Sequence, residues 1–124
     1  MTRIRTGIDI VDISRLKKNF DAHVSRWLSA QEKKYVLEKK VVPWVRLAGI
    51  FAAKESMIKA IRQSEVSYLE VCVEHDSIGA PYPVLSDRLQ KILKQEGMVS
   101  MDISISHEKE SYAVAICQIL FIDK

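Results

Sequence analysis

The sequence has few of the residues that cross-link small domains or interrupt secondary structure. Its 124 residues include two cysteines, four glycines and three prolines. Cys72 and Cys117 do not have the spacing of a metal-binding motif, and both fall in segments that we expect to be strands. Buried free thiols are therefore expected rather than a disulfide, and free thiols suit a reducing cytoplasm.

Long apolar runs and a strong charge of one sign are also missing. No apolar run is long enough to span a bilayer, and the N-terminus alternates like a strand instead of resembling a signal peptide. The net charge of +3 is too small to indicate nucleic acid, and no interleaved aromatic and basic pattern supports such binding. We expect a cytoplasmic protein without membrane or nucleic-acid binding, whose charge suits an acidic protein partner or a phosphorylated ligand.

The sequence does contain enough apolar residues for one hydrophobic core. Apolar residues make up 48% of the chain and charged residues 28%, which is typical of a globular domain. Because no repeat or linker divides it, we treat residues 1–124 as a single domain. Strand-like and helix-like segments are mixed along the chain, which predicts the α+β class.

The longest helical pattern runs from Pro43 to Arg62. Apolar residues recur along it at helical spacing, at Leu47, Ile50, Phe51, Met57, Ile58 and Ile61. Lys54 would lie in the middle of this stripe, where a charge is costly unless it is paired. Glu55 and Lys59 would lie at its edge. Two explanations of Glu55 and Lys59 stay open. They form an ordinary ion pair between residues four apart on a helix, or they belong to a site that binds phosphate and metal.

An aspartate stands in the strand expected for residues 3–11. Alternation places Ile4, Ile8 and Ile10 on one face, and Arg5, Gly7 and Asp9 on the other. Aspartate is depleted in strand interiors, so Asp9 requires an explanation. It could accept a hydrogen bond from a neighbouring loop, pair with an arginine, or belong to a functional site.

The remaining segments alternate between expected helices and strands. We expect a helix capped by Asp12 through Phe20, a helix from the Ser29–Glu32 capping box to about Lys40, a strand at 69–74, an edge strand at 83–85, a helix from Ser86 to Glu96, and a hairpin of strands 101–107 and 112–122. His23 and His75 have no motif around them, and we expect them to be structural.

Three segments in this order resemble the holo-acyl-carrier-protein synthase branch of the 4′-phosphopantetheinyl transferases. They are Gly7–Val11, Phe51–Glu55 and Ile103–His107, the last followed by Tyr112–Ala115. The resemblance covers nearly the whole chain. It implies that family's fold, an antiparallel sheet packed against a long central helix. It also implies an enzyme that moves 4′-phosphopantetheine from coenzyme A to a serine of an apo acyl or peptidyl carrier protein and releases 3′,5′-ADP.

The resemblance also implies roles for particular residues. Asp9 and Glu55 would bind a Mg²⁺ or Mn²⁺ ion, and Glu55 would accept the serine proton, directly or through a water. Lys59 would contact coenzyme A and stabilise the leaving phosphate, and His107 would lie at the coenzyme A site. Arg15 would meet an acidic carrier protein. Members of the family are usually homotrimers with their sites at subunit interfaces.

The sequence departs from the family pattern at three places. Ile50 replaces an arginine that helps bind the coenzyme A phosphates, and residues 61–65 replace a glycine-rich loop. Ala80 replaces a lysine in the turn before Pro81. Arg62 or a lysine elsewhere could compensate for the lost charge. These departures leave an alternative function open, in which a weakened or inactive relative serves as a carrier-protein binding module.

Overall fold

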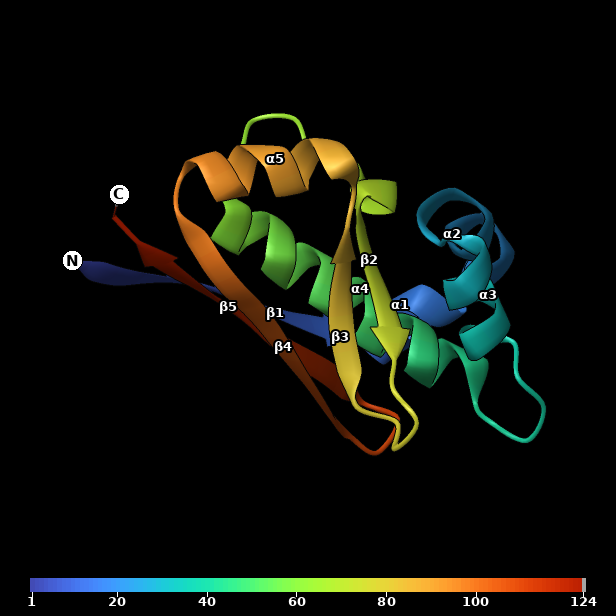
Figure 1. The fold of residues 1–124 in the computed structure, drawn as a ribbon. Helices are drawn as coiled ribbons and strands as arrows, with labels where there is room; N and C mark the ends of the chain where they lie inside the picture. Colours follow the sequence, from blue (N-terminus) through green and yellow to red (C-terminus); the bar gives the residue numbers. More distant parts are fainter. Residues whose placement is uncertain (124) are drawn as a thin grey trace.

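The computed structural model describes residues 1–123, which form an α+β fold around one long helix, α4 (Figure 1). The elements are β1 (Thr2–Asp12), α1 (Ile13–Lys17), α2 (Phe20–Trp27), α3 (Ala30–Val36), α4 (Pro43–Ile61), the 3₁₀ turn η1 (Tyr68–Glu70), β2 (Val71–His75), β3 (Pro81–Leu85), α5 (Asp87–Gln95), β4 (Met98–Glu108) and β5 (Tyr112–Ile122). The expected fold class and the long central helix are confirmed.

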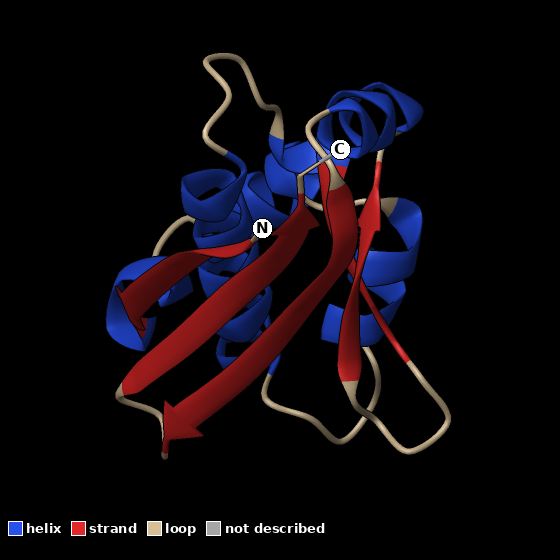
Figure 2. Cartoon of the chain, turned by 60° about the vertical axis from the view of Figure 1, so that its left-hand side comes forward, coloured by secondary structure: helices blue, strands red, loops and turns tan. Residues whose placement is uncertain are grey.

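One face of the main sheet packs against α4, and among residues 1–123 no helix lies on the other face (Figure 2). The sheet is antiparallel in the order β1-β5-β4, and β2 and β3 form a separate antiparallel pair. Figure 2 shows the uncovered face in front and the helices behind it. The C-terminal hairpin of β4 and β5 agrees with the predicted one, and both strands are 11 residues long.

Gly7 allows β1 to lie directly against the backbone of α4. A Cβ atom at Gly7 would lie 1.9 Å from the carbonyl oxygen of Ser56, closer than any side chain can approach. Alternate residues of a strand share a face, so Asp9 also points toward α4. The close contact at Gly7 therefore holds the Asp9 carboxylate beside this helix.

The predicted alternation of β1 is confirmed, and its isoleucine side is the exposed one. Ile4, Ile8 and Ile10 have 58%, 59% and 67% of their surface exposed, whereas Arg5 is only 8% exposed. Ile8 lies opposite Ile116 on β5, which is itself exposed. We call the side chains of Ile4, Ile8, Ile10, Ile116 and Ile122 the outer isoleucine face.

Two predicted helices have different bounds in the structure. The helix expected from Asp12 to Phe20 is wrong, because α1 ends at Lys17 and a separate helix, α2, begins at Phe20. Asn19 separates them with a left-handed backbone (φ 57°), a conformation that asparagine tolerates better than most residues. The helix expected to reach Lys40 ends at Val36.

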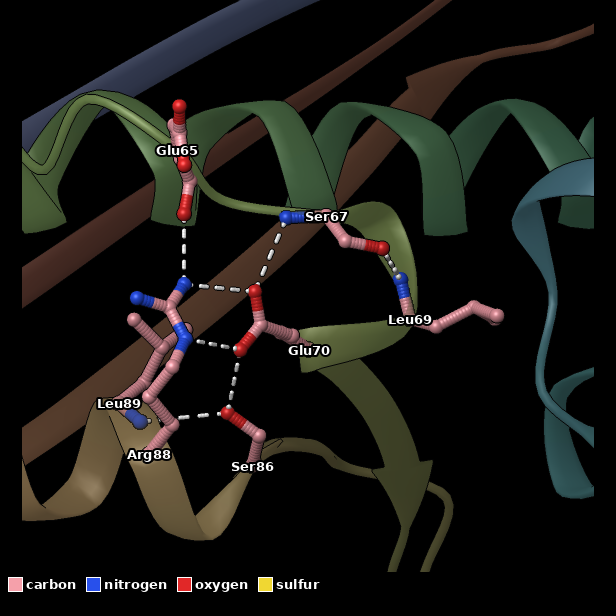
Figure 3. A network of polar contacts seen from close by, with 7 residues as sticks. All are labelled: Glu65, Ser67, Leu69, Glu70, Ser86, Arg88 and Leu89. Carbon is pink, nitrogen blue, oxygen red and sulfur yellow. Dashed lines mark hydrogen bonds and ion pairs between the residues drawn. The ribbon is translucent and has the colours of Figure 1, made fainter.

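The strand expected from residue 69 begins at Val71, because η1 precedes it. The Ser67 side chain and the Glu70 carboxylate cap this turn reciprocally, which winds Tyr68–Glu70 instead of extending it. Arg88 of α5 donates two hydrogen bonds to the Glu70 carboxylate, at 2.7 and 2.8 Å, and one to the Glu65 carbonyl (Figure 3). These Arg88 hydrogen bonds lower the pKa of Glu70 to about 2, so the carboxylate stays charged at neutral pH.

The two cysteines are free, as expected. Cys117 is fully buried and Cys72 is half-buried. Burial raises the pKa of Cys117 to about 12, which keeps its thiol protonated. Within residues 1–123, no helix is both long and apolar enough to cross a membrane.

A fully buried ion pair connects four elements. Lys54 Nζ of α4 lies 2.7 Å from Glu32 Oε1 of α3, and both side chains have no exposed surface. Glu32 also accepts hydrogen bonds from the backbone N–H groups of Ser29 and Val73, the latter in β2. Lys54 donates to the Tyr68 carbonyl of η1 at 2.7 Å. The buried lysine is therefore paired, as the apolar stripe around it requires.

Lys54→Met should destabilise the fold strongly. The methionine keeps the apolar stem but leaves the Glu32 carboxylate buried without its cation, a change that costs about 3–5 kcal/mol. Urea denaturation measures the free energy of unfolding. Lys34→Met, at an exposed lysine of α3, is the matched control and should change it by less than about 0.5 kcal/mol. Equal stabilities of the two variants would contradict this role of the pair.

Candidate active site

The end of β1 and the C-terminal half of α4 bring three of the predicted residues together, namely Asp9, Glu55 and Lys59. Lys59 Nζ lies 3.1 Å from Asp9 Oδ1 and donates to the Ile8 carbonyl at 2.8 Å. Lys59 does not pair with Glu55 along the helix. Its side chain extends to β1 instead. Asp9 is therefore paired with a cation, as we considered, but this cation is a lysine instead of an arginine.

Asp9 and Glu55 line one cavity of about 410 Å³, together with Arg15 of α1. Its walls include the aromatic rings of Trp27 and Phe51. We call this space the carboxylate cavity. Asp9 and Glu55 are half-buried, whereas Arg15 is exposed at the rim. Residues far apart in the sequence, which the resemblance grouped in one site, therefore lie around the same space.

Tyr68 contacts the Glu55 carboxylate, and the sequence pattern did not indicate it. The Tyr68 hydroxyl donates a hydrogen bond to Glu55 Oε1. Burial, followed by this bond to a carboxylate, raises the pKa of Tyr68 to about 12, so the hydroxyl remains a donor at neutral pH. Its ring centroid lies 5.6 Å from those of both Trp27 and Phe51. The sequence predicted a strand from residue 69, which gave no reason to place Tyr68 near α4. The 3₁₀ turn η1 places the ring there.

The two carboxylates fit part of a Mg²⁺ site. Among residues 1–123 no three histidine, cysteine, aspartate or glutamate side chains cluster in a way that would enclose an ion. Mg²⁺ does not require such a cluster, because it is commonly held by one or two carboxylates, with water and substrate phosphate oxygens completing its octahedron. Asp9 and Glu55 are hard oxygen donors on one cavity wall, so the residues present suit this type of ion.

His107 lies in a different cavity, on another side of α4. This space of about 720 Å³ has apolar lining that includes Ile50 and Ile105. Its polar lining includes two cations, two histidines and one carboxylate: Arg46, Lys109, His75, His107 and Glu110. We call it the histidine cavity. Ile50 and Glu55 are five residues apart, which places them about 140° apart around the helix. Within one chain, His107 is therefore not brought together with Asp9 and Glu55.

Arg46 is the residue of the histidine cavity that the sequence reasoning missed. It stands one turn before Ile50, so the two share a face of α4. Its guanidinium lies 4.1 Å from the centroid of the Tyr35 ring, and Nη1 donates to the Tyr35 carbonyl and to Glu38. Ile50, at 1% exposure, is part of the apolar lining. A search for basic residues one turn from Ile50 would have found Arg46.

The other candidate charge, Arg62, lies elsewhere. It ends α4 with a left-handed backbone (φ 57°), and its charge acts on Arg5. It does not line the histidine cavity, whereas Lys109 does. Of the candidates considered for compensation, Lys109 therefore lines the same cavity as Ile50 and Arg62 does not.

His23 and His75 are packed against aromatic rings. The His23 ring stacks on Trp27 at 4.2 Å, and the His75 ring stacks on Tyr35 at 3.8 Å. Burial lowers the pKa of His75, and the nearby positive charge of Arg46 lowers it further. Both also line a cavity, which no motif around them indicated.

Comparison with known proteins places the whole fold in one family. The sequence model of the 4′-phosphopantetheinyl transferase superfamily matches residues 5–117. The holo-[acyl-carrier-protein] synthase of Caldanaerobacter subterraneus subsp. tengcongensis is 31% identical over 117 residues, which is 91% of each chain. That of Finegoldia magna is 33% identical over 98% of this chain and 99% of the relative.

Solved structures agree with the sequence relatives. The Helicobacter pylori holo-[acyl-carrier-protein] synthase in complex with coenzyme A is 30% identical, with a TM-score of 0.78 over 92% of this chain and 98% of that one. A Bacillus anthracis holo-(acyl-carrier-protein) synthase in complex with CoA (3′,5′-ADP) is 28% identical, with a TM-score of 0.79 over 98% of this chain and 100% of that one. The chain therefore belongs to the holo-[acyl-carrier-protein] synthase branch of the 4′-phosphopantetheinyl transferase superfamily.

Proposed function

We propose that this protein transfers 4′-phosphopantetheine from coenzyme A to a serine hydroxyl of an apo acyl or peptidyl carrier protein, releasing 3′,5′-ADP. The observation that carries the proposal is the carboxylate cavity, where Asp9 and Glu55 meet beside Lys59. A Mg²⁺ or Mn²⁺ ion held there by Asp9 and Glu55 would neutralise charge on the pyrophosphate. The relatives named as holo-[acyl-carrier-protein] synthases, two of them solved with coenzyme A, support the same reaction.

The side chains of the carboxylate cavity supply the proton acceptor and the charge that the transfer needs. The serine oxygen attacks the phosphorus that bears pantetheine, and the bond from that phosphorus to the 3′,5′-ADP oxygen breaks. Glu55, directly or through a water, accepts the proton of the serine hydroxyl. Lys59, held at the cavity by Asp9 and the Ile8 carbonyl, stabilises the negative charge that develops on the leaving phosphate.

The carrier protein approaches the exposed basic side of α1. Arg15, Lys17 and Lys18 are exposed there, and Arg15 lines the rim of the carboxylate cavity. Positive charge beside the reacting groups speeds the encounter with an acidic partner and favours the correct orientation. Arg15 is thus the side chain that we assign to carrier-protein binding.

We place the nucleotide end of coenzyme A in the histidine cavity. Its apolar lining suits an adenine ring, and Arg46, Lys109 and His107 are basic groups for the terminal phosphate. Because the carboxylate and histidine cavities lie on different sides of α4, one coenzyme A would join the carboxylate cavity of one subunit to the histidine cavity of the next. This arrangement requires an oligomer, and a homotrimer is the assembly that the family resemblance implies.

The alternative function is a binding module that captures the carrier protein without modifying it. It is favoured by the apolar Ile50, by Ala80 and by the absence of a glycine-rich loop after α4. Arg46 and Lys109 argue against the binding module, because both place positive charge in the same cavity as Ile50. Release of 3′,5′-ADP distinguishes the two functions, since only the transferase produces it.

Asp9→Ala and Glu55→Ala should each reduce transfer to the level found without protein. Each removes one of the two carboxylates that would hold the metal ion, and Glu55→Ala also removes the proton acceptor. Chromatography of the 3′,5′-ADP released in the presence of coenzyme A, Mg²⁺ and an apo carrier protein measures the rate. Asp87→Ala, at an exposed aspartate of α5, is the control. Wild-type rates from either site variant would remove the proposed metal site.

Arg46→Gln should weaken coenzyme A binding about tenfold, the effect of losing one charge-assisted hydrogen bond. Dephospho-coenzyme A, which lacks the terminal phosphate, should bind both proteins equally. Adding Ile50→Arg should restore the affinity, because residue 50 lines the same cavity one turn away. Isothermal titration calorimetry measures the affinities of the unchanged protein, Arg46→Gln and the double variant. Lys91→Gln, at an exposed lysine, is the control. Equal losses for both ligands would mean that Arg46 does not bind this phosphate.

Ile116→Lys should separate the subunits. We assign the contact between subunits to the outer isoleucine face, because this face is apolar and exposed. Ile116 lies in the central strand of the sheet, opposite Ile8 on this face, and a lysine there would place a charge in that contact. Light scattering should give about three times the 14.2 kDa chain mass for the unchanged protein and one chain mass for the variant. Ile78→Lys, at an isoleucine 87% exposed in the β2–β3 turn, should leave the trimer intact. A monomeric unchanged protein would contradict the proposed assembly.

A further inference from the structure

Each of the two carboxylates in the carboxylate cavity has one oxygen bound by a side-chain donor. Asp9 Oδ1 accepts from Lys59 at 3.1 Å, and Glu55 Oε1 accepts from the Tyr68 hydroxyl. The contacts described for these carboxylates use only those two oxygens, so Oδ2 and Oε2 are the ones left for a ligand.

Tyr68 is fixed in place from several directions. Its carbonyl accepts a 2.7 Å hydrogen bond from Lys54, which is itself held by the buried Glu32. Its ring contacts Trp27 and Phe51. The turn that carries it is capped by Ser67 and Glu70 and tied to α5 by Arg88 (Figure 3). A tyrosine held this firmly restricts the Glu55 side chain, which would otherwise choose among several rotamers.

We infer that Tyr68 is a positioning residue, whose hydroxyl holds Oε1 of Glu55 so that Oε2 is directed to the cation of the proposed transfer. The inference rests on the proposed function, because it assigns Glu55 to metal binding. Ligating carboxylates are usually oriented by such outer hydrogen bonds, and loss of one typically costs about 10–100-fold in metal affinity or activity. Tyr68 itself contacts neither the substrate nor the transferred group.

The test compares Tyr68→Phe with Tyr82→Phe. Tyr68→Phe removes the hydroxyl and keeps the ring between Trp27 and Phe51, so the thermal unfolding temperature should change little. Tyr82 also has its hydroxyl on a carboxylate, that of Glu74 at 3.4 Å, but on β3 and exposed. It is therefore a matched control for the loss of a tyrosine hydroxyl.

The principal measurement is Mn²⁺ affinity, followed by electron paramagnetic resonance of free Mn²⁺ in the presence of 3′,5′-ADP. Tyr68→Phe should weaken Mn²⁺ binding about tenfold, and Tyr82→Phe should leave it unchanged. In the transfer assay, Tyr68→Phe should lower kcat at limiting Mg²⁺, and added Mg²⁺ should restore kcat. The KM for the carrier protein should not change. A purely structural role would not produce this dependence on metal concentration.

The outcomes separate this inference from the proposed function. Wild-type Mn²⁺ affinity in Tyr68→Phe would overturn the positioning role, even if transfer by the unchanged protein were efficient. A parallel loss in Tyr82→Phe would overturn it too, because the effect would then not be specific to Glu55. If the unchanged protein transferred nothing and bound no Mn²⁺, the proposed function itself would fail, and this inference with it.

Discussion

The buried ion pair between Glu32 and Lys54 is the interaction on which the site depends. It lies inside an apolar helix face and connects α3, α4, β2 and η1. Two charges without exposed surface require polar partners in place of water. Here Glu32 uses both oxygens, and Lys54 binds the Tyr68 carbonyl in addition to Glu32. The pair fixes the turn that carries Tyr68 against the helix that carries Glu55. Local geometry at the carboxylate cavity therefore depends on contacts made one layer deeper in the core.

The second constraint is the close contact between β1 and α4. Because Gly7 has no side chain, the strand lies against the helix backbone at Ser56, and Asp9 comes within reach of Lys59. A strand aspartate and a helix glutamate thus share one cavity without either distorting its element. The outer face of the same strand is apolar and exposed. In the proposed assembly, one face of this strand would serve the site and the other would contact a neighbouring subunit.

Much of the fold could be predicted from local patterns, because alternation, helical periodicity and capping boxes are local. The Ser29–Glu32 box, the Pro43 helix start and the final hairpin follow from such patterns. The break at Asn19 was missed because an αL residue leaves no periodic signal. The roles of Tyr68 and Arg46 were missed for another reason. Tyr68 acts through a tertiary contact with Glu55, which spacing along the chain does not record. Spacing does place Arg46 one turn before Ile50, but it does not show which cavity that face of α4 lines.

The proposed transfer can be tested most directly by the mass of the acceptor. An apo carrier protein, incubated with this protein, coenzyme A and Mg²⁺, is analysed by intact-mass spectrometry beside a sample with chelator. Several carrier proteins are compared, since the site does not specify one. We predict a metal-dependent gain of one phosphopantetheine on at least one of them. No gain on any carrier protein, with this protein folded and coenzyme A bound, would contradict the account and favour the binding module.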